Sequence, residues 1–184
     1  MTLGKIWEPD FLLLNREGEE FRLRGGCLCF PSFWVLSEKL GHPVSFIHGP
    51  VPTLNGALGT QIQMFLQRLK PGEVWERTNW GLAATPELNC HPNRNLRRLD
   101  AGVTLDKVWL RAEHQAFVLL PETGGLLFGI RVSLHSVNEL AVETEFRDGL
   151  RRFLETMPLE VSRYKGLEQA REALIGQLAR ERFE

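Results

Sequence analysis

Runs of hydrophobic residues, several of them alternating with polar ones, predict five β-strands. β-Branched and aromatic residues are frequent in these runs, which Gly, Pro or polar clusters bound. The five predicted strands cover residues 11–14, 20–23, 74–82, 107–120 and 126–134. The polar residues 15–19 and the Gly-containing residues 121–125 each join two successive strands and predict hairpins. The Arg-Gly-Gly sequence at 24–26 predicts a break or bulge before an apolar run at 27–30.

Apolar residues three or four positions apart predict helices elsewhere in the chain. Residues 54–69 form the longest such segment of the first half, and Pro71-Gly72 ends it. In the C-terminal part, residues 137–140, 146–157 and 166–182 are predicted to be helical. The last of these segments has an apolar stripe of Leu167, Ala170, Leu174 and Leu178.

Residues 31–40 predict a short amphipathic helix. Pro31 suits the first turn of a helix, and the hydroxyl group of Ser32 can satisfy a free amide there. Gly41 can adopt the left-handed conformation that ends a helix. We therefore expect a helical segment between the first strands and the long helix.

His48 follows an apolar turn at residues 44–47 and precedes Gly-Pro-Val-Pro. Two prolines restrict the backbone, so His48 is expected to be held stiffly. A stiffly presented imidazole suits an axial metal ligand. The alternative is a histidine that only caps a helix end by hydrogen bonding.

The order of elements indicates an α+β fold. Two strands, a helical middle, three strands and a helical tail suggest an antiparallel sheet with its helices on one face. We expect one domain over residues 1–136 and a C-terminal helical extension, residues 137–184, that packs on the same domain. A ligand pocket between the helical insert and the sheet is the natural consequence.

Composition excludes several classes of partner. The 184 residues include 22 basic and 23 acidic ones, mixed along the chain, so no basic stripe predicts nucleic-acid or anionic-membrane binding. The sequence contains no run of about 18 apolar residues, so no membrane span is predicted. The charged residues Lys5, Glu8 and Asp10 make the start of the chain unlike a secretory signal peptide, so a cytoplasmic location is expected. The three cysteines argue for free thiols.

Polar side chains are expected to share faces of two neighbouring strands. Alternation places Arg77 and Asn79 on one face of the strand at 74–82, with Trp80 on the other. Alternation also places Arg111, Glu113 and Gln115 together on the strand that starts at residue 107. The alternative for any of these residues is a cross-strand pair that only fixes the register of the sheet. The loop at 85–105, rich in Pro, Asn and Arg, is a candidate lid.

Several short motifs in a fixed order resemble those of the haem-dependent oxidative N-demethylase family. The resemblance covers residues 10 to 175 approximately. The motifs are Phe30-Pro-Ser-x-Trp34-x-Leu-x-Glu38-Lys-Leu-Gly41, Ile47-His48-x-Pro50-Val-Pro52, Arg77-x-Asn79-Trp80, Leu110-Arg111-x-Glu113-x-Gln115, Leu120-Pro121, Phe128-x-Ile130-Arg131 and Tyr164-Lys-Gly166.

The resemblance implies a PAS-like fold that holds a b-type haem between the helical insert and the sheet. It implies that O2 is activated at the iron and that a small secondary amine, such as dimethylamine, loses an N-methyl group as formaldehyde. His48 is then the proximal iron ligand. The chain has no Cys-x-x-Cys-His sequence, so the haem is expected to be held without thioether links.

The resemblance also implies roles for the strand residues. Arg77 and Asn79 can supply donors that stabilise charge on bound O2. On the next strand, Glu113 can hold the ammonium group of the substrate, and Arg111 is a further catalytic candidate. Asn79, Trp80 and Gln115 are expected to line the cofactor pocket, Trp80 as a packing wall. His114 breaks the family pattern and is expected to point away from Glu113.

Electrons have to come from a partner. The chain has too few cysteines for a four-thiolate iron–sulfur site and no Gly-x-Gly-x-x-Gly sequence after a strand, so flavin and iron–sulfur centres are expected on a partner reductase. Two other functions remain open: a haem-based sensor of O2, CO or NO, and a haemless PAS-like module that binds a ligand or protein. In the sensor, the C-terminal helix could dimerise the protein. A zinc site of Cys27, Cys29, Cys90 and His91 fits the usual ligand spacings poorly.

Overall fold

The structure is a computed structural model that describes residues 9–52 and 54–180. The chain divides into two compact units, which we describe in turn. The first comprises residues up to 79 together with 88–95 and 113–132, and the second comprises 80–87, 96–112 and the chain from 133 onward.

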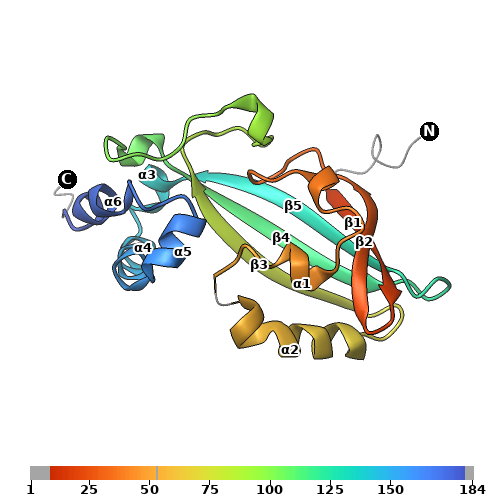
Figure 1. The fold of residues 1–184 in the computed structure, drawn as a ribbon. Coiled ribbons are helices and arrows are strands. Elements are labelled where there is room, and N and C mark those ends of the chain that lie inside the picture. Colours follow the sequence, from red (N-terminus) through yellow and green to blue (C-terminus); the bar gives the residue numbers. More distant parts are fainter. Residues whose placement is uncertain (1–8, 53, 181–184) are drawn as a thin grey trace. The chain divides into compact units, whose positions relative to one another are not determined.

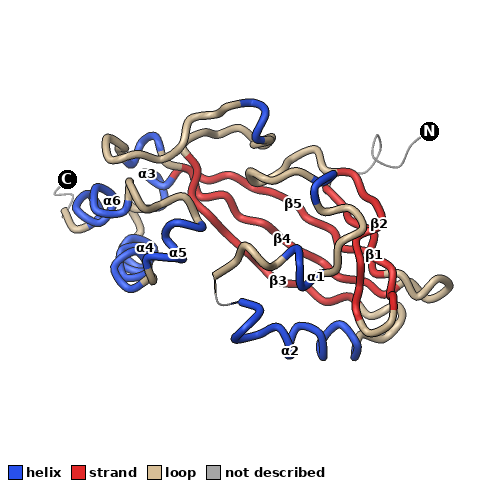
Figure 2. The backbone as a smooth tube through the Cα atoms, viewed as in Figure 1, coloured by secondary structure: helices blue, strands red, loops and turns tan. Residues whose placement is uncertain are grey.

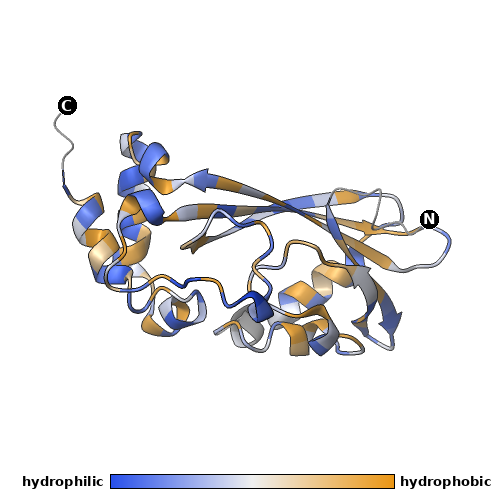
Figure 3. Ribbon diagram, turned by 90° about the horizontal axis from the view of Figure 1, so that it is seen from above, coloured by the Kyte–Doolittle hydropathy of each residue, from blue (hydrophilic) through white to orange (hydrophobic). Residues whose placement is uncertain are grey.

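A single antiparallel sheet carries the fold, and five strands form it in the order β2-β1-β5-β4-β3 (Figure 1, Figure 2). The strands are β1 (Asp10–Glu17), β2 (Glu20–Cys27), β3 (Val74–Ala83), β4 (Trp109–Leu119) and β5 (Leu126–Ser136). Figure 3 shows hydrophobic and hydrophilic residues along the same strands, and in the first half of β2 the burial alternates, as expected for a strand with one buried face. The predicted α+β class, the five strands and both hairpins are confirmed.

The first hairpin contains the predicted irregularity. Gly18, at φ 63°, supplies the left-handed residue of the tight turn. Leu13 pairs with Gly25 whereas Leu14 pairs with Leu23, so Arg24 is an extra residue that bulges from β2. Beyond the bulge, Gly26 lies so close to the carbonyl oxygen of Phe11 that no side chain would fit there.

Helices α1 (Val44–Ile47) and α2 (Leu54–Arg68) cover one face of the sheet in the first unit. Cross-strand pairing of Leu12 with Phe128 and of Leu14 with Leu126 places these four side chains on that face. Leu66 of α2 and Leu69, just after its C-terminal end, pack in the same cluster as these side chains, and both are buried. The predicted helix at 54–69 and the apolar turn before His48 are therefore confirmed.

The predicted helix at 31–40 is wrong, because only Leu36–Glu38 forms a single 3-10 turn. The carbonyl group of Pro31 accepts a hydrogen bond from the amide of Cys90 over 3.0 Å, and Ser32 forms a β-bridge with the same residue. Phe33 then has φ 64°, which a helix does not allow. Backbone pairing with Cys90 thus occupies hydrogen-bonding groups at residues 31–32 that a helix would have used.

The apolar run at 27–30 does not continue β2 beyond Cys27. The amides of Cys29 and Phe30 donate hydrogen bonds to the carboxylate of Asp10, over 2.6 and 2.9 Å. This carboxylate turns the chain away from the sheet.

The second unit is a helical cluster packed on the ends of β3, β4 and β5. Its helices are α3 (Val137–Leu140), α4 (Thr144–Thr156), α5 (Leu159–Tyr164) and α6 (Arg171–Leu178). Leu154, Leu174 and Leu178 form the centre of its core, each at most 1% exposed. In the described ranges, no helix combines the length and apolar character that crossing a bilayer demands.

The helix predicted at 166–182 is shorter than expected, and α5 was not predicted. Gly166, with φ 68°, has the left-handed conformation that ends a helix, and it follows the end of α5 closely. The next helix, α6, starts at Arg171. Residues 181–182 lie outside the described residues. The predicted stripe from Leu167 to Leu178 is nevertheless entirely buried.

Candidate functional site

The carboxylate of Glu113 on β4 lies at the centre of a polar network in the first unit. Its Oε1 accepts a hydrogen bond from the hydroxyl group of Ser32 over 2.5 Å. Its Oε2 accepts one from the side-chain amide of Asn79 over 3.2 Å and another from that of Gln115 over 2.9 Å. Three uncharged donors thus hold both oxygens in place.

Arg77 joins the network through Gln115. Its Nε donates to the side-chain oxygen of Gln115 over 2.7 Å, and its guanidinium carbon lies 5.5 Å from the centre of the Phe117 ring. Burial lowers the pKa of Arg77, and the charge of Glu113 partly offsets that effect. The residue as a whole is exposed, whereas the hydrogen bond from its guanidinium group to Gln115 is partly buried.

Gln115 separates the cation from the anion. Its amide accepts from Arg77 on one side and donates to Glu113 on the other. Among the described residues, no ion pair joins Arg77 directly to Glu113. The anionic charge of Glu113 therefore remains available to a cationic ligand.

His48 is the residue after α1, and its amide donates to the carbonyl oxygen of Val44 over 2.9 Å. Its Nδ1 atom is buried and has no hydrogen-bond partner within the part of the chain that the structure describes. Burial lowers the pKa of His48 and the positive charge of Arg77 lowers it further. Both effects favour the neutral imidazole, and a neutral imidazole with an unsatisfied nitrogen is the state that binds a metal.

A cavity of about 290 Å³ lies beside His48, between α1, α2 and the β1–β2 turn. Phe21, Val44, Ile62 and Leu66 supply its apolar walls. Glu19, Glu20, Ser45, Gly59, Thr60 and Gln63 complete the lining.

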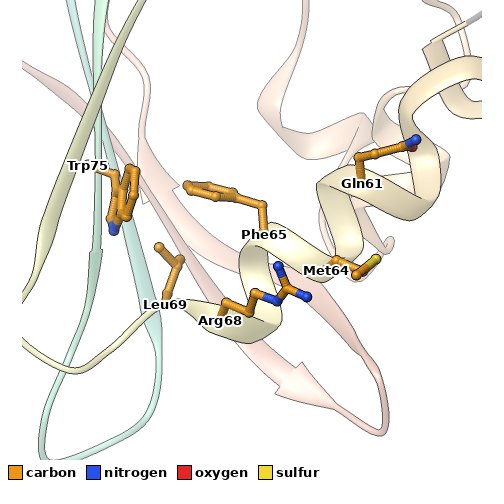
Figure 4. A pocket seen from close by; sticks show the side chains of 6 residues that line it. All are labelled: Gln61, Met64, Phe65, Arg68, Leu69 and Trp75. Carbon is orange, nitrogen blue, oxygen red and sulfur yellow. The ribbon is translucent and has the colours of Figure 1, made fainter.

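A second hollow of about 370 Å³ lies between α2 and the start of β3 (Figure 4). Phe65 of the helix and Trp75 of the strand meet edge to face there, with ring centres 5.4 Å apart. His48 does not line this second hollow.

His48 fits an axial haem ligand in its chemistry, because its buried Nδ1 is unsatisfied. No three His, Cys, Asp or Glu side chains form a metal-binding group within residues 9–52 and 54–180. A metal bound by His48 would therefore need a cofactor that brings its other ligands, as a porphyrin does. The cavity, at about 290 Å³, is slightly smaller than the range for small-molecule sites, about 300–1,000 Å³, so in this conformation it does not hold a macrocycle.

Two of the predicted site residues belong to the second unit. Arg111 is buried there and donates to the carbonyl oxygen of Glu87 over 3.2 Å. The ring of Trp80 lies 4.6 Å from that of Phe153, and its carbonyl oxygen accepts from Lys165 over 2.9 Å. The network in the first unit therefore contains Arg77, Asn79, Glu113 and Gln115 without them.

Sequence reasoning missed Ser32 as part of the site, because the wrongly predicted helix gave it the role of a helix cap. The one useful signal was its place in the motif that starts at Phe30. His114, expected to point away from Glu113, is exposed.

One comparison with known proteins identifies the family. A family model described as "Haem-dependent oxidative N-demethylase, alpha subunit-like" matches residues 1–175. The match spans nearly the whole chain and includes every residue of the polar network and His48. The chain belongs to the haem-dependent oxidative N-demethylase alpha subunit-like family.

Proposed function

We propose that the protein is a haem-binding oxygenase subunit that removes a methyl group from a small secondary amine. The reaction would use O2 and electrons from a partner reductase that carries flavin and iron–sulfur centres. The cofactor would be b-type haem in a PAS-like domain, and the protein would act in the cytoplasm. Membership of the family supports the haem-dependent chemistry, and the side chains of the first unit suggest how this chain contributes to it.

His48 would hold the haem iron. Burial and the charge of Arg77 lower its pKa, which favours the neutral imidazole, and its buried Nδ1 has no partner among the described residues. Haem, when bound, supplies the iron at which O2 is activated for oxidation of an N-methyl group. The apolar walls beside His48 would exclude water from one side of the site.

Glu113 would bind the protonated amine, and its arrangement is the observation that carries the proposal. A secondary ammonium group has two N–H donors, and a carboxylate is the acceptor that it binds best. Ser32, Asn79 and Gln115 fix the carboxylate without neutralising it. Arg77, held away by Gln115, would attract negative charge that develops on oxygen.

The absorption spectrum of the purified protein after haem is offered tests the first half of the proposal. We expect a Soret band in the wild type and its loss or displacement in His48→Ala. His42→Ala is the matched control, since His42 lies on the same segment but stacks on Phe46, with ring centres 3.9 Å apart. A normal Soret band in His48→Ala would remove His48 as the ligand, and a colourless wild type would favour the haemless module.

Amine binding tests the second half. Adding dimethylamine to the haem-loaded protein should change the spectrum, and a chemical reductant with O2 should then release formaldehyde. Glu113→Gln keeps the size of the side chain but removes its charge, so it should weaken amine binding at least about tenfold. Glu122→Gln, in the exposed β4–β5 turn, should not. Reversible gas binding with no response to amines would instead indicate a sensor.

A further inference from the structure

Two cysteine thiols face each other where β2 ends. The Sγ atoms of Cys27 and Cys29 lie 3.7 Å apart, and one thiol donates a hydrogen bond to the other. Cys27 is half-buried and Cys29 is exposed, so solutes can reach the pair. The third cysteine, Cys90, is fully buried.

The backbone holds the pair in this arrangement from two sides. Cys27 lies opposite Phe11 in the ladder between β1 and β2. Cys29 is fixed by Asp10, whose carboxylate accepts hydrogen bonds from the amides of Cys29 and Phe30. Asp10 is only 2% exposed, so this anchor belongs to the core of the first unit.

The bend at Cys29 is what makes the contact possible. In a regular strand, residues two apart are about 6.6 Å from each other, which is near the upper limit for a disulfide. The chain leaves the strand after Cys27 and bends at Cys29, so both thiols point to one place.

We propose that Cys27 and Cys29 form a redox-active dithiol that closes into an intramolecular disulfide when a peroxide is present. One thiolate attacks the peroxide, breaks its O–O bond and becomes a sulfenic acid, while the first water leaves. The second sulfur then attacks the sulfenic sulfur, forms the S–S bond and releases the second water. Two thiols and one hydrogen peroxide thus give one disulfide and two waters.

The disulfide is expected to be readily reversible. A ring that contains only one intervening residue is strained, and strained, accessible disulfides are reduced easily. Burial, the neighbouring Cys27 and the charge of Asp10 raise the pKa of Cys29, so this thiol is protonated in the resting protein. The pair therefore rests as a dithiol, and one thiol has to lose its proton before its sulfur attacks the peroxide.

Peptide mapping tests this inference without any need for haem or amine. Trypsin should release Cys27 and Cys29 on one peptide, residues 25–39, and Cys90 on another, residues 78–94. Reduced protein is treated with a single equivalent of hydrogen peroxide, then denatured, alkylated and digested. We expect the 25–39 peptide to be two hydrogens lighter and not alkylated, and the 78–94 peptide to be alkylated.

Dithiothreitol added before alkylation should restore both alkylation sites. Cys27→Ser and Cys29→Ser should each abolish the lighter peptide, whereas Cys90→Ser should leave it unchanged. Sulfinic acid on the 25–39 peptide, covalent dimers, or equal loss of the Cys90 thiol would overturn the proposal.

Discussion

The hydroxyl group of Ser32 donates a 2.5 Å hydrogen bond to the carboxylate of Glu113, which lies 81 positions further along the chain. Ser32 comes from the irregular segment after β2, and Glu113 comes from β4. The contact therefore links the segment before α1 to β4, the strand next to the edge strand β3. It orients one oxygen of the carboxylate while side chains of the sheet orient the other.

Replacing Ser32 should destabilise the first unit. Ser32→Ala leaves an oxygen of Glu113 without this donor, and we expect a loss of about 1–2 kcal/mol in the free energy of unfolding. Urea denaturation measures the change. Ser37→Ala, an exposed change in the nearby 3-10 turn, should cost much less, and Ser32→Thr should recover part of the loss. Equal effects of Ser32→Ala and Ser37→Ala would contradict this role.

Removing the charge of Arg77 should raise the pKa of His48. Arg77 lowers that pKa through its positive charge, although burial is the larger cause. In Arg77→Met the pKa should therefore rise, but only part of the way to its ordinary value. NMR titration of the histidine ring protons gives the value directly. Arg68→Met, an exposed change on α2, is the control, and an unchanged His48 pKa in Arg77→Met would show that the two groups do not interact.

His48 should also make the fold less stable in acid. Because its folded pKa lies below the unfolded value of about 6.5, the unfolded chain binds a proton more readily as the pH falls. The free energy of unfolding should decrease from about pH 6.5 downward through the lowered folded pKa, and His48 adds no such dependence above that window. His48→Gln should flatten this part of the profile measured by urea denaturation. His114→Gln, at an exposed position, should keep its shape.

The core of the second unit should be sensitive to loss of volume. Leu174 is 1% exposed and lies within the apolar cluster of α4 and α6. Leu174→Ala should lower the free energy of unfolding by about 2–5 kcal/mol, because it leaves a cavity. Leu159, on α5, is 50% exposed, so Leu159→Ala should change stability by less than about 1 kcal/mol. Thermal or chemical denaturation would show a similar loss in both variants if the core were loosely packed.

The sequence predicted the sheet well, because strand periodicity and turn chemistry are local properties. The strands at 107–120 and 126–134 and the turn between them could be recognised from the residues themselves. The segment at 31–40 failed for the opposite reason. Its helical pattern is outweighed by a backbone pairing with Cys90, about 60 positions away, and no local signal encodes such a pairing.

The grouping of polar side chains in the candidate site was predictable for the same reason as the strands. Alternation along two strands placed Arg77, Asn79, Glu113 and Gln115 on shared faces, and the hydrogen bonds between these residues agree with that prediction. Alternation does not show which residues of a strand belong to which unit, so Arg111 was grouped with Glu113 although Arg111 lies in the second unit. Ser32 required knowledge of a tertiary contact.

The extra residue Arg24 determines on which side of β2 each of the following side chains lies. Side chains of a strand emerge on alternate sides, and a two-against-one mismatch resets that alternation. If the ladder continued from Leu23 without a bulge, Arg24 would lie opposite Leu13, and Cys27 would lie opposite Asp10 instead of Phe11. The sulfur of Cys27 would then emerge on the opposite side of the ribbon and lose its neighbour, so a one-residue insertion in a hairpin decides whether the two sulfurs can meet at all.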